Sequence, residues 1–485
     1  MKSGMTDGVA GKVRSVFSDM AVYKSAKRNK MFASMGIPSY LRDWLLMRLA
    51  DHEGQVDPDE VQRYVNQYIP RRERWESLKA EMVNEGRTVR FLAKVRVELD
   101  VKSGTGMFSL PDLGFPRSKY EAVVDNRLLR ENKVGLLSSP ETWGILDLEW
   151  RQETIPGRPP EGRIFMVGFK PFQPYQVDLD FFCEARNEFT LEEWIDVLLT
   201  GIDYNPVGFI TLSEKQTMLS RLLPFVERRL NIVELAPKGT GKTYVYSQLS
   251  KYGWLVSGGS ISRARLFYDI ARRVPGLVSR HDYVALDEIQ SISFPDEDEV
   301  RGALKGYLES GEYRVGDYRG IGESGFVLLG NIDVETMRAS ANMFAQLPPA
   351  FRESALVDRF HGFIKGWHIP RMRENLKSDG WGINSEYLSE IFHELRDDVR
   401  YRAVVDELLH VPKGADTRDT EAVKRVCTGL LKLLFPQAVS ADAIRPDQFE
   451  EYCLAPALSM RGVIRKQLHI MDSEYPEGMP GISVG

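Results

Sequence analysis

The chain has 485 residues, of which 43% are hydrophobic and 27% charged, and its formal net charge is −5 at pH 7. This length allows about three domains, and the composition is that of a globular protein with enough apolar side chains for several cores. No apolar run is long enough to span a bilayer, and the N-terminus lacks a continuous apolar signal region. We therefore expect no membrane partner and a cytoplasmic location. Three scattered cysteines favour buried thiols over disulfides or zinc.

The first part of the chain, residues 1–85, is predicted to be a helical segment with a basic start. Its first 30 residues contain seven Lys or Arg and two Asp. A basic surface of this kind can bind a phosphate backbone, but a solvated basic tail explains the same charge. Apolar side chains at helical spacing predict a helix over 38–50, and Asp57 followed by Pro58 predicts the start of another.

Residues 86–188 are predicted to form a β-rich domain. Apolar and polar residues alternate over 89–99, and further strand-like runs follow at 120–124, 143–148 and 163–167. Several short strands separated by Gly/Pro-rich connectors suggest a small antiparallel barrel or sandwich, with an oligonucleotide-binding (OB-like) barrel as one candidate. Such a domain could hold DNA through phosphate contacts and stacking, or it could be a packing module. The sequence leaves both interpretations open.

A glycine-rich segment follows an apolar run and precedes a helical stretch. This segment, residues 236–243 and below called the glycine-rich loop, reads Ala-Pro-Lys-Gly-Thr-Gly-Lys-Thr. In such a loop backbone N–H groups surround the phosphates of a nucleotide. Lys242 is predicted to reach the β- and γ-phosphates, and Thr243 to place its hydroxyl on Mg²⁺. The cofactors expected are therefore ATP and the magnesium ion (Mg2+). The predicted nucleotide contacts are Pro237, Lys238, Gly239, Thr240, Gly241, Lys242 and Thr243.

Two later strand ends carry polar groups suited to the same reaction. The apolar run 283–286 ends in Asp287 and Glu288. Asp287 is predicted to hold Mg²⁺, and Glu288 to orient and deprotonate the attacking water. Asn331 ends the apolar run 326–330 and could hydrogen-bond that water or the γ-phosphate, or simply cap a turn.

Strand-like and helical stretches alternate through this region. The predicted strands lie near 232–236, 254–257, 283–287, 326–330 and 362–366. This alternation predicts an α/β fold with a parallel sheet and the nucleotide at the carboxyl ends of its strands.

The order of these signals resembles the AAA+ ATPase family. The resemblance implies an AAA+ core over 189–375 and a helical lid with a C-terminal tail over 376–485. Arg359, in the Asp-Arg-Phe sequence before the last strand, would then meet the nucleotide of a neighbouring subunit and stabilise the transferred phosphoryl group, although an ordinary surface arginine is the alternative. Arg461 is the candidate for a second sensor reaching the γ-phosphate from the lid, with a solvated basic helix face as the alternative.

A hairpin is predicted at residues 312–320, where Gly316-Asp317 separates two short strand-like runs. It would carry Arg314 and Arg319 just before the strand that ends at Asn331. In ring-shaped relatives such as the minichromosome-maintenance helicases, a hairpin at this place points into the central channel. Its arginines are therefore candidate DNA contacts, because guanidinium groups match phosphate oxygens. A subunit contact is the alternative.

Longer stretches resemble a narrower family, the Lon-protease-like (BrxL) proteins of BREX phage-defence systems. They include the glycine-rich loop with its preceding strand, and Asp-Arg-Phe-His-Gly-Phe-Ile-Lys-Gly-Trp-His-Ile-Pro over 358–370. The resemblance implies an ATPase homo-oligomer, expected as a hexamer or a double hexamer, that binds DNA, acts in defence against bacteriophage and works with other BREX components. Long members carry a Lon-like protease domain after the lid. The stretch after residue 472 in this sequence is too short for such a domain, so we expect no peptidase activity here. Either a short natural form or a truncated one would explain this length.

Three functions remain open at this stage. The first is an ATP-driven motor or clamp on duplex DNA. The second is a protein-remodelling ATPase, for which no aromatic pore loop is evident in the sequence. The third is a nucleotide-gated scaffold in which turnover is incidental.

Overall fold

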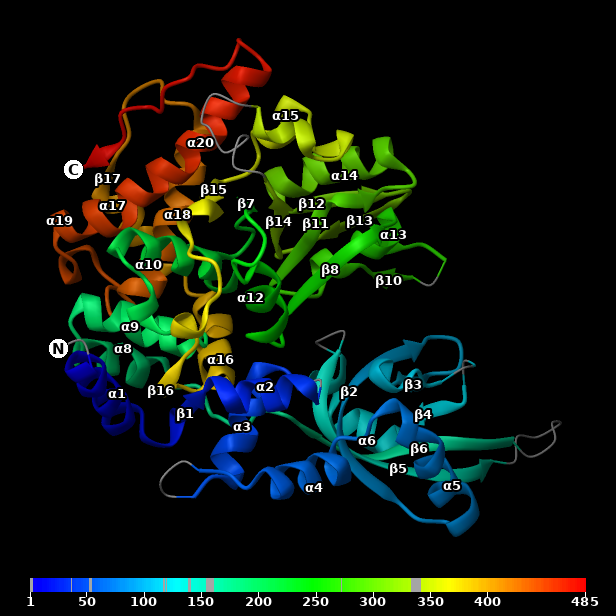
Figure 1. Cartoon of the computed structure of the whole chain (residues 1–485). Coiled ribbons are helices and arrows are strands. Elements are labelled where there is room, and N and C mark those ends of the chain that lie inside the picture. Colours follow the sequence, from blue (N-terminus) through cyan, green and yellow to red (C-terminus); the bar gives the residue numbers. More distant parts are fainter. Residues whose placement is uncertain are drawn as a thin grey trace. The chain divides into compact units, whose positions relative to one another are not determined.

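The computed structural model divides the chain into two compact units, Arg48–Gln176 and the combination of Met1–Met47 with Val177–Gly485 (Figure 1). The structure describes residues 3–35, 37–51, 55–116, 118, 120–137, 141–153, 161–271, 273–332 and 342–485. This division differs from the predicted boundaries at residues 85 and 188. We call Arg48–Gln176 the barrel unit and the remainder the sheet unit.

The barrel unit contains a closed five-stranded barrel in the order β2-β3-β4-β6-β5. Its strands are β2 (Val89–Asp100), β3 (Thr105–Ser109), β4 (Ala122–Val124), β5 (Thr142–Glu153) and β6 (Glu161–Pro171). Strands β4 and β6 pair in parallel, and the other neighbours are antiparallel. The sequence predicts a small antiparallel barrel or sandwich here, and the structure shows a closed barrel with one parallel pair. The sequence pattern missed β3, whose two small residues at its start interrupt the apolar alternation.

Helices before the barrel belong to the same unit. They are α4 (Pro58–Tyr68) and α5 (Trp75–Glu85), and α6 (Asn126–Glu131) and α7 (Lys133–Leu137) follow β4. Asp57 caps α4 by accepting a hydrogen bond from the backbone N–H of Asp59, as predicted from the Asp-Pro pair. Trp75, Leu78 and Met82 are buried in the barrel's own core. The boundary predicted at residue 85 is therefore wrong, because α5 completes that core.

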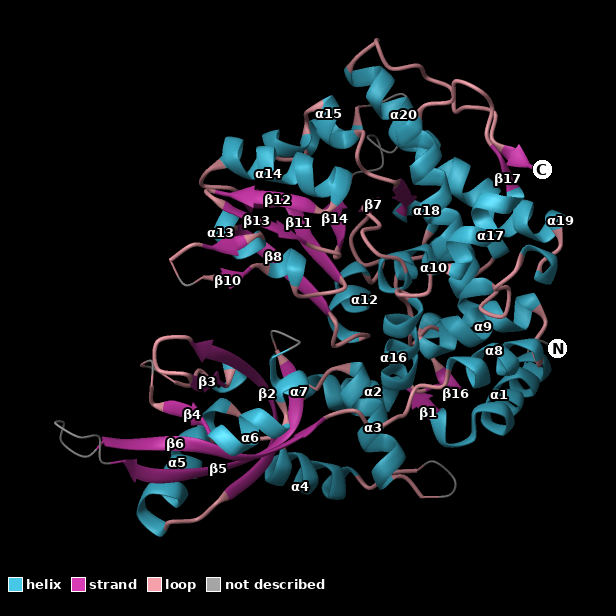
Figure 2. Ribbon diagram, turned by 180° about the vertical axis from the view of Figure 1, so that it is seen from behind, coloured by secondary structure: helices cyan, strands magenta, loops and turns pink. Residues whose placement is uncertain are grey.

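The sheet unit is built on a five-stranded parallel sheet in the order β15-β7-β14-β11-β8. Strand β15 is labelled in Figure 1 and the other four in Figure 2. The strands are β7 (Ile232–Ala236), β8 (Gly253–Ser260), β11 (Tyr283–Ser293), β14 (Gly325–Asn331) and β15 (Gly362–Lys365). All five fall where the sequence predicts them, because strands buried on both faces read as nearly continuous apolar runs. Parallel pairing brings the carboxyl ends of these strands to one edge of the sheet.

The first 47 residues are part of the sheet unit. They form α1 (Ser3–Phe17), β1 (Ala21–Ser25), α2 (Ala26–Ser34) and α3 (Ser39–Leu49), which continues into the barrel unit. Strand β1 pairs antiparallel with β16 (Asp379–Ile383). Lys24 of β1 is fully buried, with its ammonium 3.3 Å from Asp43 and 3.1 Å from Asp203. A solvated basic tail is therefore excluded for this lysine.

Helices surround the sheet and dominate the C-terminal part. They are α8 (Leu179–Asn187), α9 (Leu191–Gly201), α10 (Leu212–Leu219), α11 (Leu223–Val226), α12 (Lys242–Gln248), α13 (Arg263–Leu266), α14 (Glu297–Ser310), α15 (Ser354–Val357), α16 (Ser385–Leu395), α17 (Arg400–Leu408), α18 (Thr417–Leu434), α19 (Pro446–Phe449) and α20 (Ala455–Met471). Short strands are β9 (Tyr268–Asp269), β10 (Val274–Pro275), β12 (Glu312–Val315), β13 (Tyr318–Ile321), β17 (Leu409–His410) and β18 (Ser483–Val484). The region after β16 is mainly helical, as predicted.

Candidate functional site

The glycine-rich loop connects the buried strand β7 to helix α12. Gly239 and Gly241 have φ angles of 83° and 80°, in the left-handed region that side chains with a Cβ disfavour. An added Cβ on Gly241 would also lie only 2.1 Å from the hydroxyl oxygen of Tyr204. Gly241 is therefore required both for its backbone angle and for the space beside Tyr204. The observed shape of the loop depends on the absence of a side chain at position 241.

Lys242 is the first residue of α12, and its ammonium group lies close to the backbone at the start of the glycine-rich loop. Its Nζ is 3.1 Å from Oδ1 of Asn331 and 3.4 Å from the carbonyl oxygens of Ala236 and Pro237. Burial lowers the pKa of Lys242. The structure thus brings together two residues that the sequence assigns to the same phosphate, from β14 and from the loop. Asn331 accepts a hydrogen bond from the Lys242 ammonium through its side-chain oxygen. Its side chain therefore does more than cap a turn, which was the alternative interpretation.

Thr243 and Asp287 also meet. The Thr243 hydroxyl donates to Oδ2 of Asp287 over 2.5 Å, and Asp287 is buried at the end of the apolar part of β11. A hydroxyl and a carboxylate are the hard oxygen donors that Mg²⁺ accepts beside substrate phosphates. The pair fits a magnesium ion that is completed by phosphate and water oxygens.

Glu288 differs from its neighbour because its side chain is exposed. Its φ of 51° is left-handed, and the pairing of β11 with β8 shifts register between Asp287 and Ile292. A bulge of this kind re-aims a side chain at the end of a strand. Facing it is Gly258, whose added Cβ would lie 3.9 Å from a carboxylate oxygen of Glu288. The carboxylate therefore points away from the sheet instead of into its core.

Arg359 makes no described contact with the glycine-rich loop of its own chain. It follows α15, and its Nε lies 2.8 Å from a carboxylate oxygen of Glu309 in α14. One guanidinium nitrogen also donates to the carbonyl of Ala355. Arg418 is 3.0 Å from the same carboxylate oxygen of Glu309. Within one chain, Arg359 is therefore part of a surface ion-pair group.

The structure corrects the expectation for Arg461. This residue of α20 is completely buried, and its guanidinium bonds to Asp358 over 2.6 Å and to Asp419 over 2.7 Å. It also donates to the carbonyl oxygens of Asp358 and Phe360. These contacts use its donors and fix α20 to the chain before β15. We therefore assign Arg461 a structural role and leave it out of the site.

The predicted hairpin is present as β12 and β13. Arg314 and Arg319 face each other across it, and both side chains are exposed. The Nε of Arg314 donates to the carbonyl of Gly316 over 2.9 Å. The ring of Tyr318 stacks on Tyr268 of β9 with 3.6 Å between centroids, which supports the hairpin close to its turn. Two exposed cations are thus held on a firm support.

Sequence reasoning missed the residues that support the loop from behind. Arg221, in the short turn before α11, is buried and contacts both Glu234 of β7 and Thr240 of the loop. The backbone N–H of Met372 donates to the carbonyl of Gly239 over 2.8 Å, so the chain after β15 lies against the loop. A carboxylate inside a fully buried strand was the available signal, because such a charge requires a partner.

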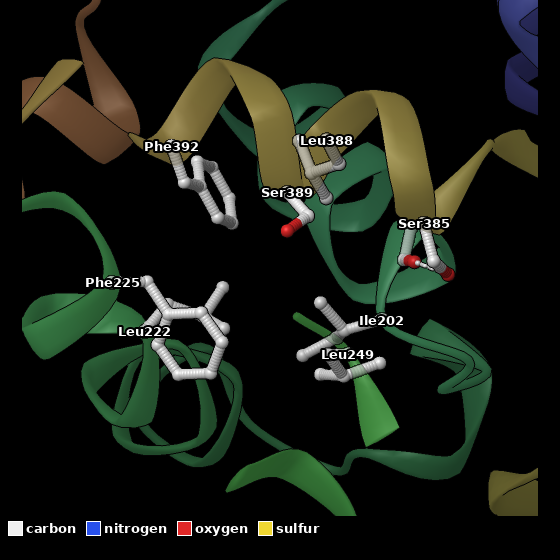
Figure 3. Close-up of a pocket in the computed structure, with 9 residues that line it drawn as sticks. Ile202, Leu222, Phe225, Leu249, Ser385, Leu388, Ser389 and Phe392 are labelled. Atoms are coloured by element: carbon white, nitrogen blue, oxygen red, sulfur yellow. Dashed lines mark hydrogen bonds between the residues drawn. The ribbon is translucent and has the colours of Figure 1, made fainter. Parts of the chain in front are cut away.

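A small cavity is lined by residues from the C-terminal ends of α9 and α12 and from α11 and α16 (Figure 3). Its volume is about 10 Å³, room for about one water molecule. Phe225, Phe392 and Leu388 surround it, and the hydroxyl of Ser389 is bonded to that of Ser250 over 2.8 Å. This is a packing space in the core and not a ligand site.

The fold is a mixed α/β fold, and comparison with known families identifies it further. A family model described as "Lon-like protease BrxL-like, ATPase domain" matches residues 164–480, and one described as "BREX system Lon protease-like protein BrxL N-terminal" matches residues 15–150. The chain therefore belongs to the BrxL family, as the sequence resemblance indicated.

Two relatives carry the name "Lon-like protease BrxL". The protein of Escherichia coli O9:H4 (strain HS) is 32% identical over 443 residues, which cover 89% of this chain and 60% of the relative. That of Bacillus cereus (strain H3081.97) is 29% identical over 468 residues, covering 94% of this chain and 66% of the relative. The chain thus spans less than two thirds of the length of these relatives. Among the helices of the described residues, none is both long and apolar enough to cross a membrane.

Proposed function

We propose that this protein is an ATP-hydrolysing AAA+ ring protein that binds duplex DNA as a motor or clamp in BREX defence against bacteriophage. The observation that carries the ATPase part is the meeting of Lys242 with Asn331 and of Thr243 with Asp287, from three elements at one edge of the sheet. The strand order β15-β7-β14-β11-β8, with the glycine-rich loop directly after β7, supports the AAA+ assignment.

In the proposed reaction the γ-phosphoryl group of magnesium-ATP is transferred to water, the bond from its phosphorus to the β–γ bridging oxygen breaks, and ADP and inorganic phosphate are released. The loop N–H groups and the Lys242 ammonium bind the phosphates, while Thr243 and Asp287 hold the magnesium ion. Glu288 orients a water molecule and accepts its proton, and Asn331 positions Lys242 at the γ-phosphate. Arg359 of a neighbouring subunit is proposed to stabilise the charge that develops on the transferred group. This step requires Arg359 to leave Glu309 and reach across a subunit interface, so the proposal includes a homo-oligomer, as a hexamer or a double hexamer.

DNA binding is proposed for two places. The exposed Arg314 and Arg319 suit a phosphate backbone. The barrel of β2 to β6 has the strand order and the parallel closing pair of an OB-like barrel, a fold that binds nucleic acid on its strand face and loops. A cytoplasmic location and contacts with other BREX components complete the proposal.

ATP hydrolysis by the purified full chain, measured with and without duplex DNA, tests this function. We expect hydrolysis that depends on magnesium and rises on addition of DNA. Stimulation by an unfolded polypeptide instead of DNA would identify a protein-remodelling ATPase. Nucleotide-dependent assembly without any stimulated turnover would identify a nucleotide-gated scaffold. Either of these two results would contradict the DNA motor or clamp.

A further inference from the structure

A carboxylate occupies the middle of the most buried strand in the sheet unit. Glu234 lies in β7, between Leu329 of β14 and Ile364 of β15, and its side chain has no exposed surface. Arg221 pairs with it through two contacts, Nε to Oε2 over 3.0 Å and Nη2 to Oε1 over 2.5 Å. Arg221 is equally buried. Both charges are thus removed from water and satisfied by each other.

The remaining donors of Arg221 reach the glycine-rich loop. Nη1 donates to the carbonyl oxygen of Thr240 over 2.8 Å, and Nη2 lies 3.3 Å from the Thr240 hydroxyl. Thr240 is itself buried and stands between the two glycines with left-handed backbone angles. One guanidinium therefore connects the central strand of the sheet to the turn of the loop.

This contact sets the direction of a peptide group. The carbonyl of Thr240 and the N–H of Gly241 belong to one planar trans peptide, so they point in opposite directions. When Arg221 draws the carbonyl toward the interior, the N–H of Gly241 must point outward. Outward is the side on which the loop would receive a phosphate.

We propose that Arg221, held by Glu234, is a positioning residue that presents the backbone N–H groups of the glycine-rich loop to the triphosphate of ATP. This inference rests on the proposed ATPase function and deepens it. The Arg221 side chain has no exposed surface. It acts through the Thr240 carbonyl, and Glu234 keeps the guanidinium in the orientation that this contact needs.

A purely structural ion pair would behave differently. Replacing both members of a buried pair by apolar side chains of similar volume often leaves a protein as stable as before, whereas removing one member leaves an unpaired buried charge. If the pair serves only the fold, the double replacement should restore everything. If Arg221 positions the loop, the double replacement restores folding but not nucleotide binding, because Thr240 has lost its donor.

The test compares Arg221→Met, Glu234→Leu and the double variant in the full chain. Thermal unfolding, calorimetric binding of magnesium-ATP, and the KM and kcat of ATP hydrolysis are measured for each. We expect the double variant to unfold near the wild-type temperature. Its Kd and KM should rise by about tenfold, the loss expected for one charge-assisted hydrogen bond, with a smaller change in kcat. Wild-type Kd and KM in a stable double variant would overturn the proposal.

A conservative variant keeps the test decisive if the double variant does not fold. Arg221→Lys retains the charge beside Glu234 but lacks the planar fork that reaches Thr240 at the same time. We expect it to fold and to show a raised KM, and unchanged KM and Kd in this variant would overturn the proposal. Lys432→Met is the matched control, because it breaks another buried ion pair, Lys432–Glu227 (2.9 Å). The other contacts of the Lys432 ammonium are with the carbonyl oxygens of Val226 and Arg396, and not with the glycine-rich loop. It should lose stability and keep its KM.

Wild-type binding separates the two levels of the proposal. A folded wild-type chain that binds no magnesium-ATP would overturn the proposed function, and this inference with it. A wild-type chain that binds magnesium-ATP, together with variants that bind it equally well, would overturn only the positioning role.

Discussion

Two adjacent acids at the end of the apolar run in β11 have opposite environments, and this difference agrees with the separate roles proposed for them. Asp287 is buried and accepts the hydroxyl of Thr243, while Glu288 is turned outward by the bulge and the left-handed backbone angle. A left-handed angle in a residue other than glycine costs free energy, and such costs are concentrated at functional sites. This geometry supports the proposed distinction between Asp287 as a metal ligand and Glu288 as a general base.

Changing Glu288 to Gln tests the second role. We expect magnesium-ATP to bind with nearly the wild-type Kd, because Glu288 makes no described contact with the loop. Hydrolysis should fall by about 100-fold or more, since the attacking water loses its general base. Calorimetric binding and steady-state turnover measure the two effects. Turnover within a few-fold of wild type would show that another group accepts the proton.

At this scale, the sequence predicts which side chains lie together where a residue type is tied to a strand end or a glycine turn. Lys242, Thr243, Asp287 and Asn331 follow strands or a glycine turn, and the parallel sheet then brings their side chains together. The prediction that Arg461 reaches the γ-phosphate differs from the structure, because helical spacing reveals a charged helix face but not whether that face is buried. Its partners Asp358 and Asp419 are 103 and 42 residues away in the sequence, and only packing brings them to it.

At the scale of elements, the β12–β13 hairpin allows a direct test of the proposed DNA binding. We expect Arg314→Ala together with Arg319→Ala to weaken DNA binding without changing basal ATP hydrolysis. The slope of log affinity against log salt should fall by about two, one for each lost phosphate contact. Binding titrations at several salt concentrations measure this slope.

The matched control replaces two arginines of the C-terminal helical region. Arg400 and Arg445 are also exposed, with 57% and 69% of their side chains accessible, and each pairs with an aspartate two residues away. Their replacement should leave the salt slope unchanged. Equal effects of both double variants would mean that total charge, and not the hairpin, governs DNA affinity.

Helix α16 carries a titrating group that faces the start of β8. Lys251 lies between Glu386, at 2.7 Å, and Glu390, so that one buried ammonium faces two carboxylates. Burial raises the pKa of Glu386 to about 7, and Glu390 contributes. Tyr252 also bonds to Glu390, and His393 pairs with Asp282 nearby on the same helix face. The proton held by Glu386 relieves the excess of negative charge.

The sign of the pH effect follows from the raised pKa. The folded state keeps the Glu386 proton up to about pH 7, whereas the unfolded chain releases it near pH 4.5. The stabilisation is therefore present below pH 4.5 and is lost as the pH rises to 7, by roughly 3 kcal/mol at 1.36 kcal/mol per pKa unit. The free energy of unfolding of the wild type, relative to Glu386→Gln, should fall over this window in denaturant titrations. Parallel curves for the two proteins would contradict the shift.

For the whole molecule, the sequence predicted the elements well but not the unit boundaries. Local patterns locate strands, and all five strands of the sheet were found. Boundaries depend on which core receives a helix: α5 packs into the barrel core, and β1 pairs with β16 across more than 350 residues. Neither partner is visible in local periodicity. The sequence also could not reveal that Arg221 and Glu234 meet, because their contact depends on the turn before α11.

Mixed assemblies test the proposed sharing of sites between subunits. Lys242→Ala and Arg359→Ala should each abolish ATP hydrolysis alone. In a random mixture, about a quarter of the interfaces would combine an intact loop with an intact arginine, so partial activity should return. Steady-state turnover across mixing ratios measures this, with each variant mixed with wild type as a control. No recovery at any ratio, in assemblies shown to exchange subunits, would place Arg359 outside the neighbour's site.

The pairing of β1 with β16 also affects how the chain is made. Strand β1 leaves the ribosome early, but its partner is synthesised more than 350 residues later. At roughly 5–20 residues per second, the nascent chain must wait on the order of tens of seconds for that partner. Meanwhile Lys24 lacks Asp203 as well, and the barrel unit, a continuous stretch, can fold first. The sheet unit is therefore completed only after the whole barrel unit has been synthesised, and a protein started beyond Ser25 would leave the β16 edge open to other chains.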